Sequence, residues 1–162
     1  MCYPRIEEIR SGMTLPADYL SRTGYRLPTG AEWEHACRAG AWTNRPYGHA
    51  EELLGRYAAH AGNAGNQALA VGTLLPNDLG LFDMLGNAAE WTNDLLFRLD
   101  PDAVRTHRVG SGPQAVTNLD LLITRGSSYR EGAARLRSGG VSSMLACAPV
   151  AGLRIVRTIR PR

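Results

Sequence analysis

Residues 25–40, with the sequence YRLPTGAEWEHACRAG, carry the clearest local structural pattern in the chain. Thr29 is a good helix N-cap residue, and Glu32 three positions later completes the Ser/Thr-x-x-Glu pattern of a capping box. Three apolar residues then share one face at helical spacing, and these are Trp33, Ala36 and Cys37. The stretch therefore predicts a short extended segment that leads into a helix over residues 30–39.

Outside this stretch, the sequence favours short strands separated by irregular loops. The chain has 162 residues, enough for one domain with a real core, and its 18 Gly and 9 Pro indicate a loop-rich protein rather than a helical bundle. Apolar residues between turn clusters predict strands at residues 70–74, 121–125 and 152–157. There is no internal repeat and no linker, so we expect a single domain over residues 1–162.

The charge of the chain is mildly basic. Its 18 basic and 15 acidic residues give a net charge of +3, and eight arginines lie between residues 125 and 162. Such arginines could bind an anionic partner, including nucleic acid, but solvated and ion-paired surface arginines explain them better. We therefore expect no nucleic-acid partner.

The sequence also gives no sign of a membrane partner. It has no apolar run of about 18 residues, and residues 1–15 lack the apolar core of a signal peptide. The chain as given is expected to be soluble. A cytoplasmic location is favoured, although a leader upstream of it would change the compartment.

Three cysteines stand far apart, at Cys2, Cys37 and Cys147. Their odd number and spacing argue against a disulfide framework and against a structural zinc site. Cys37 lies in the predicted helix and Cys147 in an apolar run, so both are interpreted as small buried apolar residues.

Four segments in a fixed order resemble the signatures of the formylglycine-generating-enzyme-like (sulfatase-modifying-factor) family. They are YRLPTGAEWEHA at residues 25–36, PNDLGLFDMLGNAAEW at 76–91, RGSSY at 125–129 and GLRIV at 152–156. The resemblance implies an α+β variant of the C-type lectin-like fold, with short strands, about two helices and much irregular loop. It also implies that the N-terminal part of the family domain is missing. Bacterial domains of this kind are often fused to kinase or other signalling modules.

The resemblance further implies a calcium site at the turn Gly86-Asn87-Ala88-Ala89-Glu90. Asn87 and Glu90 would supply side-chain oxygens, while Gly86 and Ala88 would supply backbone carbonyls, which suits a hard cation. The alternative is that Asn87 caps a turn and that Glu90 pairs with an arginine such as Arg125 or Arg154.

Oxidases of the family resemble copper enzymes with two cysteines a few residues after the RGSSY position, because Cu(I) requires soft thiolate ligands. This chain has no cysteine there, so we expect no copper and no catalytic residue. The leading hypothesis is a non-catalytic binding or sensor module, a pseudoenzyme, that recognises a protein or small-molecule ligand. Its expected ligand surface comprises Ser128, Tyr129, Arg130 and Arg137. The alternative is an oxidoreductase or accessory catalytic domain, of the oxidase or the sulfoxide synthase type, whose catalytic groups lie upstream.

Two further residue types are interpreted as parts of the scaffold. Trp33 and Trp91 each follow a glutamate and are expected to pack in the core rather than line a ligand site. Three arginines beside apolar strands are expected to bind carboxylates and backbone carbonyls, and these are Arg26, Arg125 and Arg154.

Overall fold

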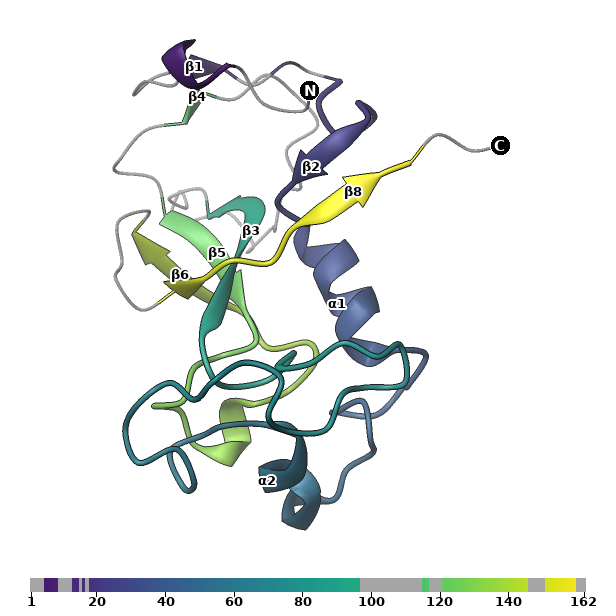
Figure 1. The fold of residues 1–162 in the computed structure, drawn as a ribbon, viewed down its shortest axis with the longest axis vertical. Helices are drawn as coiled ribbons and strands as arrows, with labels where there is room; N and C mark the ends of the chain where they lie inside the picture. Colours follow the sequence, from purple (N-terminus) through teal and green to yellow (C-terminus); the bar gives the residue numbers. More distant parts are fainter. Residues whose placement is uncertain are drawn as a thin grey trace, which may run out of the picture.

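The fold is that of a computed structural model, which describes residues 5–8, 13–14, 16, 18–96, 115–116, 121–145 and 151–159. It consists of short strands, two α-helices and long irregular loops (Figure 1). The helices are α1 (Gly30–Arg38) and α2 (Leu54–Tyr57), with 3-10 turns η1 (Ile6–Glu8), η2 (Glu51–Leu53) and η3 (Ala133–Arg135). The strands are β1 (Met13–Thr14), β2 (Gly24–Arg26), β3 (Ala89–Leu96), β4 (Ala115–Val116), β5 (Leu121–Arg125), β6 (Ser142–Leu145), β7 (Ala151–Gly152) and β8 (Val156–Thr158). The expected α+β class is therefore confirmed.

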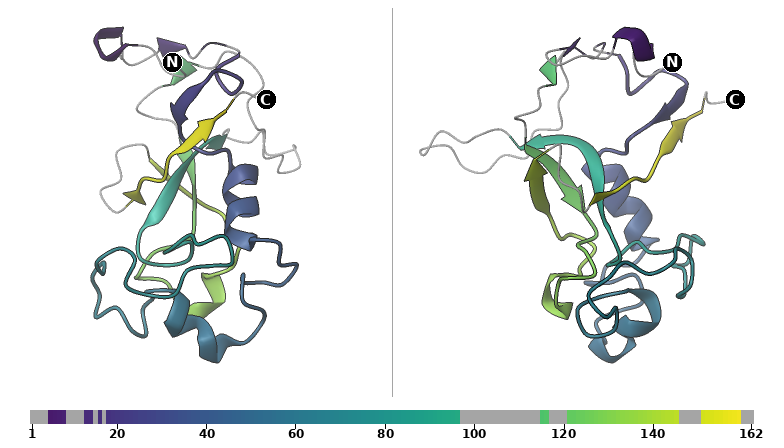
Figure 2. Two further views of the ribbon diagram at one scale, coloured as in Figure 1. Left: turned by 45° about the vertical axis from the view of Figure 1, so that its right-hand side comes forward. Right: turned by 60° about the vertical axis from the view of Figure 1, so that its left-hand side comes forward.

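A four-stranded mixed sheet forms the centre of the molecule, in the order β6-β5-β3-β7. β3 pairs antiparallel with β5 and parallel with the short β7, while β5 and β6 pair antiparallel. The register between β3 and β5 shifts between Trp91 and Leu95, which bends β3 away from a straight ladder. Helix α1 lies beside this sheet. The irregular loops gather below both, near the C-terminal end of α1 (Figures 1 and 2).

Two smaller ribbons complete the described strands. β2 and β8 form one antiparallel pair, with Arg26 opposite Val156, and β1 and β4 form another. Figure 2 shows the β2–β8 ribbon above the N-terminal end of α1, so that segments from the two ends of the sequence lie side by side.

Helix α1 begins as the sequence predicts. Thr29 accepts a hydrogen bond from the Glu32 amide, and the Glu32 carboxylate accepts one from the Thr29 amide, so both halves of the capping box are present. The helix ends at Arg38, one residue before the predicted boundary, because Ala39 adopts the left-handed conformation with φ of 50°.

The main hydrophobic core lies between α1 and the loops beneath the sheet. Its buried members are Trp33, Cys37, Leu54, Ala58, Met84, Leu85 and Leu136. The expected burial of Trp33 and Cys37 is confirmed, and burial raises the pKa of the Cys37 thiol to about 11. Cys2 and Cys147 lie outside the described residues.

The three strand predictions have different outcomes. The strand at 121–125 is confirmed as β5. The predicted strand at 152–157 is two short strands, β7 and β8, separated by three residues without regular structure. The prediction of a strand at 70–74 is wrong, because this segment contains turns and a bend. Val71 is 83% exposed there, and Gly72 has φ of 74°. Within the described part of the chain, no helix has the length and apolarity needed to span a membrane.

Candidate functional site

The turn at residues 86–90 connects the central sheet to the irregular loops. Gly86 has φ of 74°, and a Cβ atom there would lie 2.0 Å from the Ala59 carbonyl oxygen, so only glycine fits. The Gly86 amide donates to the Gly126 carbonyl at 2.8 Å, and the Asn87 amide donates to the Ala59 carbonyl at 2.8 Å. This turn therefore fixes the loops before it against the end of β5.

The Asn87 side chain holds a neighbouring loop. Its Oδ1 accepts a hydrogen bond from the Leu69 amide at 2.9 Å, and its Nδ2 donates to the Leu69 carbonyl at 3.2 Å. Asn87 is only 4% exposed and adopts φ of 57°, a conformation that asparagine tolerates better than most residues. The Asn87 side-chain amide thus pairs with both backbone groups of Leu69, as the backbone of a neighbouring strand would.

Glu90, at the start of β3, is held from two sides. The Arg154 guanidinium donates from Nε to Oε2 and from Nη2 to Oε1, both at 2.7 Å, and the Trp33 indole Nε1 donates to Oε2 at 2.7 Å. Arg154 Nη2 also donates to the Phe82 carbonyl at 2.9 Å. The predicted alternative in which Glu90 pairs with Arg154 is therefore the observed arrangement.

These contacts bear directly on the implied calcium site. Ca²⁺ takes six to eight oxygen ligands, and they must converge without competing protein donors. Here the Asn87 Oδ1 is directed at an amide of another loop, and the Glu90 carboxylate is occupied by a guanidinium and an indole. Gly86 and Ala88 adjoin these side chains, but the side-chain oxygens do not fit a calcium ion as they are placed. In the part of the chain that the structure describes, no three His, Cys, Asp or Glu side chains group as a metal site.

The turn at residues 127–131 contains most of the expected ligand surface. The Tyr129 amide donates to the Asn87 carbonyl at 2.9 Å, and the Glu131 carbonyl accepts from the Ala61 amide at 3.1 Å. These two bonds link the turn to the 86–90 turn and to the loop after α2. The backbone of the turn is therefore fixed at both ends.

The four expected surface residues are not all alike. Ser128 is 7% exposed and its Oγ accepts from the Arg130 amide, so it stabilises the turn rather than facing solvent. Arg130 is exposed, its guanidinium lies 5.3 Å from the Tyr129 ring centre, and its Nε donates to the Tyr129 hydroxyl. Arg137 is also exposed but lies beyond η3, and in the described structure its side chain takes no part in these contacts. The structure therefore brings Ser128, Tyr129 and Arg130 together, and no contact among the described residues joins the Arg137 side chain to them.

The expected scaffold arginines behave as predicted. Arg26 donates to both carboxylate oxygens of Glu32, at 2.7 and 2.6 Å, and is 5% exposed. Arg125 pairs with Glu34 at 3.2 Å and donates to the Gly140 carbonyl. Both arginines join a strand to helix α1, which explains how so short a helix is held in place.

A fourth structural arginine, Arg45, was missed by the sequence interpretation. It is 5% exposed and donates to the carbonyls of Leu136, Ala133 and His49. A weaker contact with Glu51, at 3.8 Å, supplies partial charge balance. Its partners are backbone carbonyls, which carry no side-chain signature that sequence reasoning could have used.

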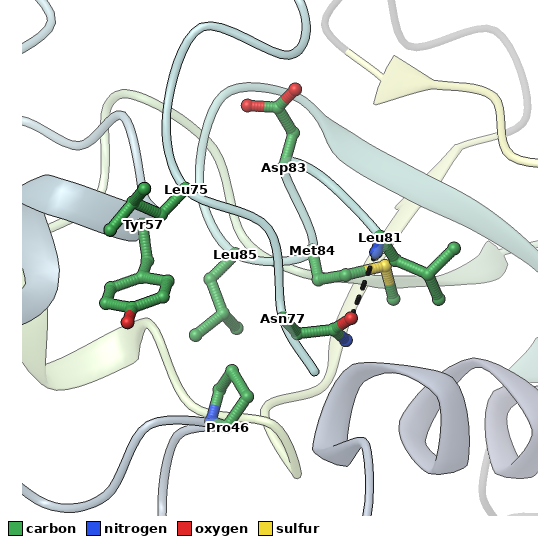
Figure 3. Close-up of a pocket in the computed structure, with 8 residues that line it drawn as sticks. All are labelled: Pro46, Tyr57, Leu75, Asn77, Leu81, Asp83, Met84 and Leu85. Carbon is green, nitrogen blue, oxygen red and sulfur yellow. Dashed lines mark hydrogen bonds between the residues drawn. The ribbon is translucent and has the colours of Figure 1, made fainter. Parts of the chain in front are cut away.

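A small pocket beneath the 77–85 loop has no room for a ligand. Its volume is about 10 Å³, which is at the lower limit for one water molecule. Figure 3 shows Tyr57, Leu75, Leu85 and Pro46 around it, with Asn77 bonded to the Leu81 amide and the Asp83 carboxylate directed away from the apolar side chains. This pocket is a packing feature.

The small mixed sheet carries long loops, and buried arginine pairs and the turn at Asn87 hold these loops in place. This arrangement defines an α+β domain with long structured loops. The chain matches the family described as the sulfatase-modifying factor enzyme 1-like domain over residues 12–159, and it belongs to that family. The resemblance found in the sequence is thereby confirmed.

Individual relatives agree with this assignment. The formylglycine-generating enzyme of Mus musculus is 38% identical over 89 residues, which cover 47% of this chain and 24% of the enzyme. That of Streptomyces coelicolor is 32% identical over 127 residues, which cover 68% of this chain and 38% of the enzyme. Chaperone protein LppX of Paenibacillus barcinonensis is 36% identical over 90 residues, 42% of this chain and 30% of that protein. This chain thus spans well under half the length of these curated relatives.

Solved structures show the same fold. Treponema denticola variable protein 1 superimposes with a TM-score of 0.68 at 27% identity, over 87% of this chain and 49% of that one. PvdO from Pseudomonas aeruginosa gives a TM-score of 0.66 at 25% identity, over 88% and 57% of the two chains. Relatives of this chain therefore include proteins named as enzymes and one named as a chaperone.

Proposed function

We propose that this chain is a non-catalytic binding module on the sulfatase-modifying-factor scaffold, with the 127–131 turn as its ligand surface. The observation that carries the proposal is the turn itself, which presents Arg130 and Tyr129 to solvent on a fixed backbone. A rigid turn loses little conformational entropy when a ligand binds, and an exposed arginine stacked on an aromatic ring is a common recognition element.

The chemistry of the same region argues against oxidase function in this chain. The sequence has no cysteine between positions 38 and 146, so the 127–131 turn offers no thiolate pair for Cu(I). Cys37 is fully buried, and burial raises the pKa of its thiol to about 11, so it is not a thiolate ligand near neutral pH. The Cys37 side chain is instead part of the hydrophobic core.

Binding at the turn is tested by a thermal-shift screen of the purified chain against a library of small metabolites. A ligand that binds the folded state raises Tm. We expect hits whose shift disappears in Arg130→Ala and persists in Arg56→Ala, a matched exposed arginine on α2. A shift in Tm that is unchanged in Arg130→Ala, or the lack of any ligand that shifts Tm, would contradict a small-molecule surface at this turn.

Oxidase activity is tested directly. The chain is incubated with Cu(I), oxygen and a cysteine-containing peptide, and aldehyde product is captured with an aminooxy reagent and identified by mass spectrometry, with the Streptomyces coelicolor enzyme as positive control. We expect no aldehyde. The alternative is a catalytic domain whose essential groups lie upstream; the alignments with two formylglycine-generating enzymes cover 24% and 38% of those enzymes. Aldehyde formed by a longer chain, but not by these 162 residues, would support that alternative.

A further inference from the structure

Trp42, in the loop that follows α1, is 96% exposed, whereas Trp33 is buried in the core. Tryptophan side chains are on average highly buried. The loop that carries Trp42 is nevertheless fixed, because the Ala41 amide donates to the Arg38 carbonyl at 2.9 Å and Arg38 Nη1 donates to the Thr43 carbonyl at 3.0 Å. The exposure of this indole is therefore built into an ordered backbone.

A second segment, at residues 137–141, lies beside this loop. The Ser138 amide donates to the Asn44 carbonyl at 2.8 Å, which joins the two segments. Trp42 and Arg137 are each within two residues of this contact, and both are exposed. Their Cα atoms are therefore at most about 17 Å apart, a span that about five residues of extended chain cover.

Positive charge is in excess around this contact. Gly139 lies against the ion pair of α1, since a Cβ atom there would be 3.4 Å from Arg38 Nη2 and 3.5 Å from Glu34 Oε1. Glu34 is shared between two cations, because it pairs with Arg38 at 2.8 Å and with Arg125 at 3.2 Å. Arg137 has no anionic partner among the described residues. Three arginines thus share a single glutamate here.

We propose that the surface formed by Trp42, Asn44 and Arg137, here called the Trp42 surface, binds an acidic peptide segment of a partner protein. An apolar or aromatic side chain of the partner would pack on the Trp42 indole, and an Asp or Glu a few residues away would pair with Arg137. Tryptophan and arginine are among the residues that most often dominate the binding energy of a protein interface. The fixed loop also loses little conformational entropy when the partner binds. This surface does not depend on the proposed ligand surface at the 127–131 turn.

The charge and the size of the Trp42 surface favour this partner over two others. A second copy of the chain would bring two positively charged surfaces together, which costs free energy. A single-stranded nucleic acid binds through a positively charged groove along its backbone and through several aromatic side chains on which its bases stack. Among the described residues, the Trp42 surface offers one tryptophan and one unpaired arginine. An acidic peptide needs only one contact of each kind.

The test is a selection of phage-displayed random peptides of about seven residues, long enough to reach both side chains, against the purified chain at pH 7. The selection is done in about 0.15 M NaCl, which screens long-range attraction between exposed charges. We expect the enriched peptides to combine an aromatic or large apolar residue with a nearby Asp or Glu. Enriched peptides are then synthesised with a fluorescent label and titrated by anisotropy. Replacing their acids by the corresponding amides should weaken binding at least about tenfold.

Variants of the chain identify the surface. Trp42→Ser and Arg137→Gln change exposed side chains, so the circular dichroism and Tm of both variants should remain close to those of the wild type. Each should weaken the selected peptides at least about tenfold. Leu79→Ser and Arg56→Gln, which change exposed side chains in other parts of the chain, should leave binding unchanged.

Three results would overturn the proposal. The first is a selection that yields no peptide whose binding is weakened by Trp42→Ser. The second is self-association of the wild-type chain, measured by analytical ultracentrifugation, that Trp42→Ser abolishes. The third is Trp42-dependent binding of a labelled oligothymidylate that is as tight as that of the selected peptides.

Discussion

Glu90 and Arg154 stand 64 positions apart in the sequence and form a two-pronged ion pair, with both nitrogen–oxygen contacts at 2.7 Å. The pair joins the start of β3 to the segment between β7 and β8, and Trp33 of α1 donates to the same carboxylate. Three parts of the chain that are distant in sequence thus meet at one buried carboxyl group.

Arg154→Ala should destabilise the fold by about 3 kcal/mol, because it leaves the carboxylate of Glu90 largely buried without its cation. The measurement is the free energy of unfolding in urea. Arg22→Ala, which disrupts an exposed pair with Asp18, is the matched control and should cost no more than about 1 kcal/mol. Similar costs for the two variants would mean that the Glu90–Arg154 pair contributes little to stability.

Calcium should not stabilise the chain through the 86–90 turn. A calcium ion there would have to displace Arg154 and Trp33 from Glu90 and the Leu69 amide from Asn87. We therefore expect the same Tm in EDTA and in millimolar CaCl₂. A calcium-dependent rise in Tm that is lost in Asn87→Ala would show that the turn rearranges around the ion.

Acid should weaken the Arg26–Glu32 pair. Hydrogen bonds from Arg26 lower the pKa of Glu32 from 4.5 to about 2, against the opposing effect of burial. Because the folded-state pKa is below the unfolded value, the pair contributes fully above about pH 4.5, and its contribution is lost as the pH falls toward 2.

Since 43% of the Glu32 side chain is exposed, solvent screening limits this contribution to about 1 kcal/mol. Urea unfolding of the wild type and of Glu32→Gln at pH 6 and pH 3 measures it. The difference between the two proteins should shrink by roughly half to two thirds of that amount at pH 3, because the folded-state pKa of about 2 leaves Glu32 still mostly ionised there. A difference independent of pH would contradict the assignment.

Gly30→Ala should destabilise the chain, although alanine is the better helix former. A Cβ at position 30 would lie 2.4 Å from Asp94 Oδ2, the atom that accepts the Gly30 amide. We expect a cost of about 1–2 kcal/mol in thermal or urea unfolding. Gly55→Ala, in α2, meets nothing closer than 3.5 Å and should be neutral or stabilising. A stabilised Gly30→Ala variant would show that Asp94 moves without cost.

Local patterns allowed the sequence to predict much of this structure. The capping box of Thr29 and Glu32 depends on three adjacent peptide units, so it is visible in the sequence and present in the fold. The Glu90–Arg154 pair was also among the predicted alternatives, in which Glu90 pairs with Arg125 or Arg154.

Other features could not be predicted because their causes are remote in sequence. The 70–74 segment has strand-like residues, yet none of the described strands pairs with Val71, which stays exposed. Arg45 is buried because carbonyls as far as 91 positions away surround it. A hollow beside Asp83 is lined by four segments that only the fold brings together, from residues 71–72, 80–83, 87–90 and 152–154.

The pairing of β2 with β8 has a consequence for how the protein folds. The Arg26 guanidinium and the Thr158 hydroxyl are hydrogen-bonded across 132 positions. Contacts of such long range require a large loop to close before they contribute any stability, which slows folding. During synthesis, the strand at residues 24–26 therefore has no partner until residue 158 has left the ribosome. Until then, the backbone groups of this three-residue strand lack their partners in β8.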